Sequence, residues 1–291
     1  MRIYKPRKLQ TRRKRLQKGS GKVQIAYHDL PAYKIPTEDR ISLPFVSENL
    51  IVLGLFDGHG GANISELLHN ELPKRIKNAI KFSQDTGTII QIINAEFDKL
   101  DAEIGTSVGG STATIVVVTK TDIIVANVGD SPAILFKKDG TLLYNTDDHD
   151  CSNMAEHDRI SNAGGTCVLL NGIPRLESGL AVTRAFGDYA HDKRIVISTA
   201  QIYVWPRQKD TYLCMCSDSF TEDYYEFQEA GQHYRTIANI KSAADVVKEI
   251  AIVLKNNNYD IEKSVKKAVE NRVALFKGHG DNTSLLLAYF P

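Results

Sequence analysis

The sequence predicts an α+β fold in which two antiparallel β-sheets pack together and helices cover their outer faces. The β-branched runs Ala113–Thr119 and Ile123–Val128 are joined by a short polar turn, as in an antiparallel meander. Amphipathic helical patterns occur in two pairs: Asn63–Phe82 with Thr88–Ile104, and Ala243–Leu254 with Ile261–Phe276. Because strands and helices are grouped in this way, the pattern does not favour a parallel sheet of βαβ units.

Further strands complete the two predicted sheets, and one large domain accounts for the whole pattern. With 291 residues, 42% hydrophobic and 24% charged, the chain has the composition of a globular protein with a substantial core. The remaining predicted strands are Asn49–Phe56, Ala133–Phe136, Thr211–Ser217 and Thr283–Phe290.

The charge is distributed unevenly along the chain. Residues 1–23 contain ten Lys and Arg and no Asp or Glu, which leaves 26 basic against 35 acidic residues in the rest. We expect residues 1–23 to be a disordered basic tail and residues 24–291 to be the folded domain. The tail is either a solvated arm without a partner or a segment that binds nuclear import factors or nucleic acid, and both interpretations stay open. The acidic body favours cations over nucleic acid.

Four cysteines, at positions 151, 167, 214 and 216, are too few for a disulfide scaffold in a chain of this length. We expect reduced thiols with structural roles. No secretory signal follows the N-terminal charges, and no run approaches the roughly 20 apolar residues that span a bilayer. The expectation is therefore a monomer that is intracellular, in the cytoplasm or nucleus, and does not enter membranes.

Aspartates stand at the ends of four predicted strands. Asp57, Asp130 and Asp218 each follow a strand, and Asp281 directly precedes the last one. A single aspartate in such a place is usually a turn former, but four of them can meet at one end of two antiparallel sheets. Because carboxylates repel one another at short range, such a group needs compensation. Hard divalent cations with oxygen ligands, Mg²⁺ or Mn²⁺, supply it.

His59 lies beside the first of these aspartates, in the segment FDGHGG at residues 56–61. The glycines leave space for a backbone carbonyl to approach an ion. A histidine in this place is either a structural residue or a catalytic one, and the residues alone leave both roles open.

These segments together resemble the metal-dependent protein serine/threonine phosphatases of type 2C, over nearly the whole chain after about residue 23. Nine short motifs occur in that family's order. They are TEDR at 37–40, FDGHGG at 56–61, GGSTA at 109–113, ANVGDS at 126–131, DH at 148–149, RISNAGG at 159–165, LAVTRAFGD at 180–188, CSDS at 216–219 and GDNTSLLL at 280–287.

The resemblance implies a four-layer αββα sandwich with a two-metal site at one end, where Mg²⁺ or Mn²⁺ activates a water that attacks phosphoserine or phosphothreonine in proteins. Asp57 would bridge both ions, and Gly58 would offer its carbonyl to one. Asp218 and Asp281 would hold the other ion, with Glu38 as a further ligand.

The resemblance also assigns Asp130 to a weaker third ion near Asp218. His59 would protonate the leaving oxygen. The phosphate contact, an arginine in the family, is Lys34 here, which supplies charge without the two-pronged guanidinium.

Several departures from the family pattern leave a second interpretation open, namely a pseudophosphatase that binds phosphoproteins with little turnover. Pro132 replaces a usual arginine. In the family's segment Ser-Asp-Gly-hydrophobic-Trp-Asp, Ser219 replaces the glycine, Thr221 the tryptophan and Glu222 the second aspartate. The DGH segment also fits calcineurin-like metallophosphatases, but their downstream GNHE segment is absent from the sequence. Cysteine-dependent phosphatases are excluded, because no cysteine begins a Cys-x₅-Arg loop.

Overall fold

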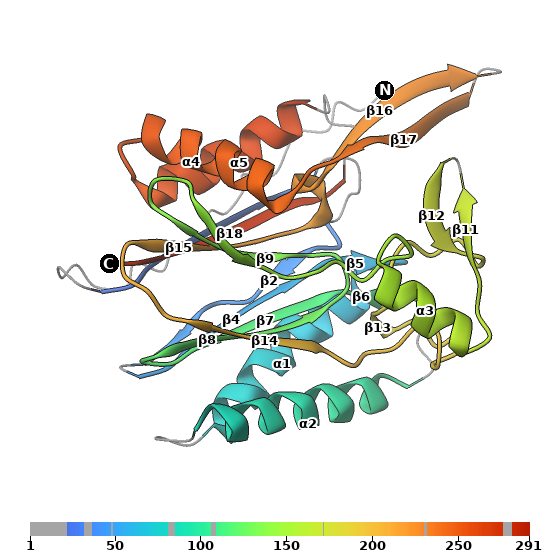
Figure 1. Cartoon of the computed structure of the whole chain (residues 1–291), viewed down its shortest axis with the longest axis horizontal. Helices are drawn as coiled ribbons and strands as arrows, with labels where there is room; N and C mark the ends of the chain where they lie inside the picture. Colours follow the sequence, from blue (N-terminus) through green and yellow to red (C-terminus); the bar gives the residue numbers. More distant parts are fainter. Residues whose placement is uncertain are drawn as a thin grey trace, which may run out of the picture.

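Two antiparallel sheets lie face to face in the computed structural model of the chain (Figure 1). The described residues are 22–31, 37–47, 49–80, 85–105, 109–170, 172–229, 232–275 and 281–291, with backbone alone for 224–229 and 232–239. Every pair of neighbouring strands within the two sheets is antiparallel, as the meander pattern predicts.

The first sheet has five strands in the order β1–β18–β15–β9–β10. The last strand of the chain therefore lies inside this sheet, between the first strand and β15. The bounds are β1 Gln24–Leu30, β9 Ala133–Lys137, β10 Leu142–Asn145, β15 Thr211–Cys216 and β18 Thr283–Phe290.

The second sheet has six strands, five of them in the order β14–β8–β7–β4–β2, with β3 paired to β4. Strands β4 and β7 are apolar and buried along their whole length. Such strands are expected where both faces of a sheet are covered. The bounds are β2 Arg40–Ile41, β3 Phe45–Val46, β4 Ile51–Phe56, β7 Ala113–Val118, β8 Asp122–Val128 and β14 Gln201–Pro206.

Three apolar clusters define four layers. Leu53 and Leu286 belong to the cluster between the sheets. On the outer face of the second sheet, Phe56 belongs to a cluster with residues of α1 (Asn63–Ala79) and α2 (Thr86–Ile104). On the outer face of the first sheet, residues of α4 (Ala243–Asn256) and α5 (Ile261–Leu275) form the third cluster. In Figure 1 the two helix pairs cover opposite faces of the sandwich.

Smaller elements extend from one end of the sandwich, at the right of Figure 1. A small sheet has the strand order β13–β6–β5, and two hairpins, β11–β12 and β16–β17, form sheets of their own. Helix α3 and the 3₁₀ helix η1 complete the described elements. The bounds are β5 Gly58–His59, β6 Gly110–Ser111, β11 Cys167–Leu170, β12 Ile173–Leu176, β13 Phe186–Gly187, β16 Glu222–Glu229, β17 Gln232–Ile240, α3 Met154–Asn162 and η1 Asp218–Phe220.

The predicted α+β class and its flanking helix pairs are confirmed, and the long elements begin and end within a few residues of their predicted bounds. The ends of the helices predicted to reach Phe82 and Phe276 lie partly outside the described residues. Strands β1 and β14 of the two main sheets, helix α3 and the hairpins β11–β12 and β16–β17 were not predicted. Most of these elements are short or mix polar with apolar residues, so they lack the long apolar period that identified the other elements.

Candidate functional site

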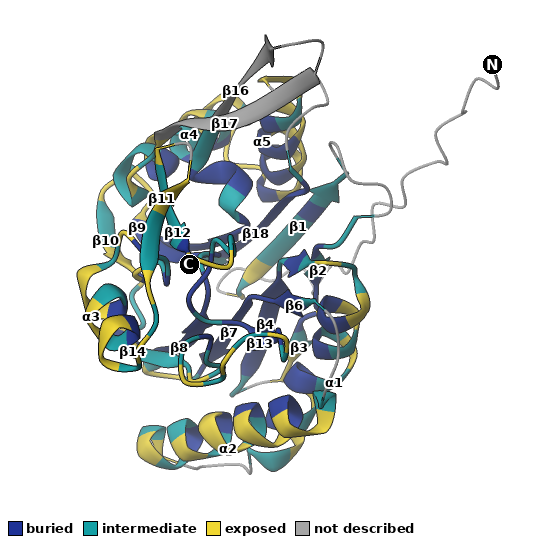
Figure 2. Cartoon of the chain, turned by 90° about the vertical axis from the view of Figure 1, so that its right-hand side faces the viewer, coloured by how far each residue is buried: buried dark blue, intermediate teal, exposed yellow. Residues whose placement is uncertain are grey.

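Four strands of the two sheets bring their aspartates to one end of the sandwich. Strands β4 and β8 are both antiparallel to β7, so they run in the same direction, and Asp57 and Asp130 follow them at the same end. Strand β15 is antiparallel to β18, so the end of β15 lies beside the start of β18, with Asp218 near Asp281. Figure 2 views the molecule toward this end.

Asp57 lies at the centre of the group. Burial raises the pKa of its carboxyl well above the usual range, and the charges of Asp39, Asp218, Asp281 and Asp130 raise it further. Five carboxyl groups therefore share one electrostatic environment. Because these carboxylates repel one another, at least one of them tends to be protonated unless a cation is bound. The donor set is entirely oxygen, as Mg²⁺ and Mn²⁺ prefer.

Asp39 belongs to this group, although sequence reasoning did not select it. Its side chain is buried, and among the described residues neither carboxylate oxygen makes a hydrogen bond of normal geometry. Burial raises the pKa of Asp39 to about 6, although Ser284 and Asp57 lie near enough to lower it. A buried carboxylate with unsatisfied oxygens fits a cation ligand. The signal was present, because Asp39 directly precedes β2, which pairs with β4 beside Asp57.

Glu38 and Gly58 meet at the same end. The Glu38 Oε1 atom accepts a hydrogen bond from the Gly61 amide at 2.8 Å, and the Glu38 amide donates to Asn282 Oδ1 at 2.8 Å. A Cβ on residue 58 would lie 2.7 Å from the Glu38 carbonyl oxygen and 2.7 Å from Ser65 Oγ. Glycine is therefore required at position 58, where the backbone passes close to the acidic group.

The acidic group offers carboxylate oxygens, which a partly hydrated divalent cation can use as ligands. In the described part of the chain, no group of three or more His, Cys, Asp or Glu side chains is already arranged as a metal cage. Mg²⁺ takes one or two carboxylates from a protein and keeps several water molecules. The number, burial and oxygen chemistry of these carboxylates fit such an ion.

His59 stands beside the acidic group on β5. Its Nε2 atom lies 2.6 Å from Asp188 Oδ2, and the two side chains are 26% and 6% exposed. The imidazole is thus accessible to a substrate, whereas its partner is buried. Asp188 was not selected from the sequence. Lys34, the predicted phosphate contact, lies outside the described residues.

The segment after Asp218 departs from the family pattern but is held firmly. Arg272 on α5 is 2% exposed, and its Nε and Nη2 atoms donate to the Ser219 carbonyl at 2.9 and 2.7 Å. It also donates to the Glu222 carbonyl at 2.9 Å and to Asp223 Oδ1 at 2.9 Å. Arg272, 53 positions from Ser219 in the sequence, therefore fixes the turn that carries Asp218.

A second acidic group borders the first. Burial raises the pKa of Asp130 to about 8, and the charges of Asp218 and Asp150 raise it further. Burial also raises the pKa of Asp148 well above its usual range, with Asp130 as the next cause. The carboxyl group of Asp130 thus lies close enough to Asp218, Asp148 and Asp150 to share their electrostatic field.

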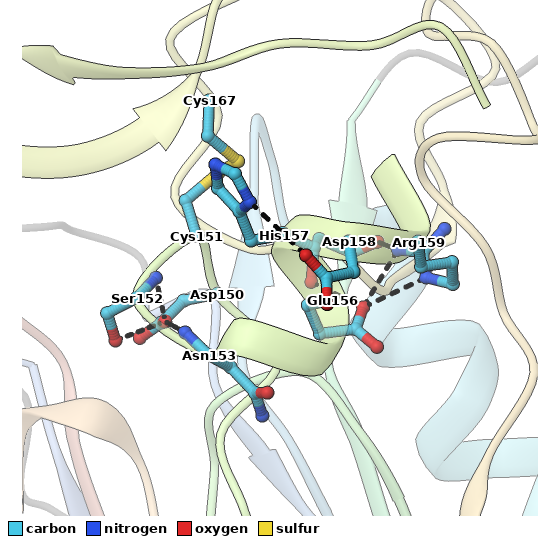
Figure 3. Close-up of a disulfide and its surroundings, with 10 residues drawn as sticks. Asp150, Cys151, Ser152, Asn153, Glu156, His157, Asp158, Arg159 and Cys167 are labelled. Atoms are coloured by element: carbon cyan, nitrogen blue, oxygen red, sulfur yellow. Dashed lines mark hydrogen bonds and ion pairs between the residues drawn. A yellow bond between two sulfur atoms is a disulfide. The ribbon is translucent and has the colours of Figure 1, made fainter. Parts of the chain in front are cut away.

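The expectation of four reduced cysteines is wrong for two of them. Cys151 and Cys167 form a disulfide, with their Cα atoms 5.8 Å apart, and it joins the turn before α3 to the start of β11 (Figure 3). The pairing depends on the antiparallel return of the chain after α3, which spacing in the sequence does not reveal. Cys214 and Cys216 are free thiols buried on β15, as expected.

Helix α3 anchors the loop that leads to Asp188. The Glu156 carboxylate, 2% exposed, accepts hydrogen bonds from Arg184 Nε at 3.0 Å, Arg159 Nη2 at 2.8 Å and Thr183 Oγ1 at 2.8 Å. Burial raises the pKa of Glu156, but Arg184 and Arg159 outweigh it and lower this pKa to about 2. Figure 3 shows Glu156 directed toward Arg159.

No helix in the described ranges has both the length and the apolar character needed to cross a bilayer.

Comparison with known proteins gives concordant results. The family model for protein phosphatase 2C matches residues 28–258. A probable protein phosphatase 2C 55 from Oryza sativa subsp. japonica is 35% identical over 178 residues, which cover 58% of this chain and 46% of that protein. A probable protein phosphatase 2C 11 from Arabidopsis thaliana is 29% identical over 275 residues, covering 92% of this chain and 67% of that protein. The chain thus spans about half to two thirds of these relatives.

Solved structures share the fold at low sequence identity. A phosphatase from Toxoplasma gondii superposes with a TM-score of 0.74 at 20% identity, and the match covers 93% of each chain. A sex determining protein of C. elegans gives a TM-score of 0.72 at 20% identity, covering 94% of this chain and 66% of that one.

Proposed function

The chain belongs to the protein phosphatase 2C family, and we propose that it is a metal-dependent protein serine/threonine phosphatase. The observation that carries the proposal is the position of Asp57, half-buried and in the electrostatic field of four further aspartates from four different strand ends. Five carboxyl groups gathered in one place destabilise a fold unless they are protonated or a ligand compensates them, because each charge raises the pKa of its neighbours. Divalent cations are that ligand, and phosphate esters are a substrate class that such cations serve.

Each proposed ligand offers an oxygen donor and lies near one end of β2, β4, β8, β15 or β18. Asp57 would serve both of two Mg²⁺ or Mn²⁺ ions, and the Gly58 carbonyl would serve one of them. Asp130 would contribute with Asp218 to a weaker third ion. The full set is Glu38, Asp39, Asp57, Gly58, Asp130, Asp218 and Asp281.

The chemistry divides between the ions and the chain. When bound, the ions supply a water of lowered pKa as nucleophile and offset the charge on the phosphoryl oxygens. His59 supplies the proton that the serine or threonine oxygen needs when its bond to phosphorus breaks, because an alkoxide is a poor leaving group. Lys34 attracts the phosphate by charge.

The first test is phosphate release from a phosphothreonine peptide with Mn²⁺ and then with chelator. We expect turnover with Mn²⁺ and none in its absence. Asp57→Asn should abolish turnover and weaken Mn²⁺ binding in calorimetry, whereas Asp139→Asn, on the exposed turn after β9, should change neither. Wild-type turnover by Asp57→Asn would refute the ligand assignment.

Thermal unfolding supplies a second readout that does not depend on activity. In chelator, Asp57→Asn should unfold at a higher temperature than the wild type, because the substitution removes a charge from the acidic group. With Mn²⁺ the order should reverse, because binding stabilises the wild type. An unchanged order in the two conditions would contradict the site.

The departures at positions 34, 132, 219 and 222 favour one second candidate, a pseudophosphatase that binds phosphoproteins. The same experiment separates the two. A pseudophosphatase would bind Mn²⁺ and the phosphopeptide but release no phosphate above the rate of Asp57→Asn.

We further propose that the protein acts as an intracellular monomer on phosphoprotein substrates and that residues 1–23 are an electrostatic arm. Residues 1–21 lie outside the described ranges. Deletion of residues 1–23 should leave peptide turnover unchanged and reduce nuclear accumulation and retention on heparin, because the segment carries ten basic residues and no acidic ones. Unchanged retention and distribution would leave the arm without a partner.

A further inference from the structure

The small sheet β13–β6–β5 brings two distant side chains together over a glycine. In this sheet, Gly110 on β6 stands opposite His59 on one side and Gly187 on the other. Asp188 directly follows Gly187. His59 and Asp188, 129 positions apart in sequence, therefore flank the same residue, and their side chains meet at 2.6 Å. The labels β5, β6 and β13 lie at the same end of the molecule in Figure 1.

Gly110 makes this contact possible. A Cβ on residue 110 would lie 2.6 Å from Asp188 Cγ and 2.6 Å from His59 Nε2, closer than real Cβ contacts. The backbone at Gly110 does not have a positive φ, so a side chain is excluded there by the His59–Asp188 pair and not by backbone strain. The space above Gly110 is occupied by the pair itself.

Asp188 is fixed from the opposite side by α2. Its φ is 53°, a left-handed conformation uncommon for a residue with a side chain, and its amide donates to the Gly109 carbonyl at 2.9 Å. Asp101 on α2 accepts a hydrogen bond from the Gly187 amide at 3.0 Å, and Tyr189 Oη donates to the Asp101 carbonyl at 2.6 Å. The residues on both sides of Asp188 are thus tied to a helix of the core.

We propose that Asp188 is a positioning residue for His59, which it holds with the proton on Nε2, and that Gly110 is required for this contact. The inference rests on the proposed phosphatase function and deepens it. A carboxylate that accepts from one ring nitrogen sets the tautomer and the orientation of an imidazole. Because Nε2 is held by Asp188, Nδ1 is the nitrogen that exchanges a proton with the substrate.

The proton transfers balance in this arrangement. The proton on Nδ1 of the charged imidazole moves to the serine or threonine oxygen as the bond from that oxygen to phosphorus breaks. His59 is left neutral, with its Nε2 proton still donated to Asp188. Solvent returns a proton to Nδ1 before the next turnover.

A spectroscopic measurement tests the contact without reference to activity. In ¹⁵N-labelled protein, at a pH where the ring is neutral, His59 should show the Nε2–H tautomer alone. In Asp188→Asn the two tautomers should mix, because the side-chain amide of asparagine can also donate. The His59 signals are assigned by their loss in His59→Gln. Unchanged tautomer populations in Asp188→Asn would overturn the proposal.

Kinetics test the positioning role. General acid catalysis typically contributes about 10² to 10⁴-fold, so His59→Ala should slow turnover of a phosphothreonine peptide by this order. Asp188→Asn should slow kcat by about 10-fold or more, within that limit, and leave KM nearly unchanged. Both variants should retain most of their activity on p-nitrophenyl phosphate, whose leaving group needs little protonation. Equal losses on both substrates would indicate a structural role and refute the proposal.

A double variant and a glycine variant complete the design. His59→Ala with Asp188→Asn should be no slower than His59→Ala alone, because Asp188 acts through His59; multiplied losses would overturn the proposal. Gly110→Ala should behave like Asp188→Asn, with slower turnover of the phosphothreonine peptide and most of the activity on p-nitrophenyl phosphate retained. A wild-type rate of Gly110→Ala on the peptide would also overturn the proposal. The matched controls are Asp139→Asn, on the turn after β9, and Gly87→Ala, at the start of α2. Both control variants should turn over the two substrates at wild-type rates.

Failure of the proposed function has a different signature. In that case the wild type releases no phosphate with Mn²⁺, and the tautomer measurement alone decides whether Asp188 orients His59. If the wild type turns over with Mn²⁺ and His59→Ala does so equally well, the phosphatase function stands and the positioning role is refuted.

Discussion

Replacement of Glu156 by glutamine should destabilise the protein at neutral pH through the loss of one buried charge. Glu156 is 2% exposed and faces Arg184 and Arg159, whose side chains are 15% and 23% exposed. Glutamine keeps the size of the side chain and one acceptor oxygen, so the substitution removes mainly the charge. The two arginines remain, and they also bind backbone carbonyls of the loop from Thr183 to Thr199.

The magnitude follows from the lowered pKa. The pKa of Glu156 falls from 4.5 to about 2, as the arginines outweigh burial. At about 1.4 kcal/mol per pKa unit, this corresponds to about 3 kcal/mol of stability at pH 7. Because the folded-state pKa is the lower one, the contribution is complete above pH 4.5 and is lost as the pH falls toward 2. About 1.4 kcal/mol should remain at pH 3.

Urea unfolding followed by the fluorescence of Trp205, the single tryptophan and 4% exposed, measures this difference. The free energy of unfolding of the wild type should exceed that of Glu156→Gln by about 3 kcal/mol at pH 7 and by less than half of that at pH 3. Glu103→Gln, which breaks an exposed pair with Arg75, is the control and should match the wild type. A difference that is under about 1 kcal/mol at pH 7, or that does not change with pH, would refute the reasoning.

Two further predictions concern stability around the second acidic group. His149 is buried, accepts from the Gly129 amide at Nδ1, and has its pKa lowered to about 4, first by burial and then by Arg184. Because the lowered pKa favours the neutral ring in the folded state, the free energy of unfolding of the wild type should fall by about 3 kcal/mol between pH 6.5 and pH 4. The His149→Gln variant should not show this fall, and parallel pH curves from urea unfolding of the two proteins would contradict the prediction. Reduction of the Cys151–Cys167 disulfide, whose cysteines are 16 positions apart, should cost about 3 kcal/mol of stability, and a thermal midpoint unaffected by reductant or by Cys167→Ser would contradict this magnitude.

The aspartates at the site could be placed from the sequence because the strands that carry them are visible in it. Apolar runs of six to eight residues fix where a strand ends, and Asp57 and Asp281 adjoin such runs. The His59–Asp188 contact could not be placed, because it depends on the register of two-residue strands that have no periodic signal. Its cause, the missing side chain of Gly110, is evident in three dimensions alone.

Arg272 illustrates a signal that was present and was not used. The apolar stripe of α5 runs through Ile261, Val265 and Val269, and Arg272 continues it at helical spacing. A charged residue on an apolar stripe must find partners inside the core. The sequence therefore indicated a buried arginine, although its acceptors on the turn after Asp218 required the folded chain.

The position of β18 inside the first sheet determines when the site can be assembled. This strand pairs with β1 on one side and β15 on the other, and Asp281 precedes it. As the chain is synthesised, the first sheet remains divided until residues 283–290 are inserted, so β1 waits for a partner more than 250 residues away. Contacts of such long sequence separation form slowly. We therefore expect the acidic group to become able to bind ions at a late step of folding, after β18 has closed the sheet.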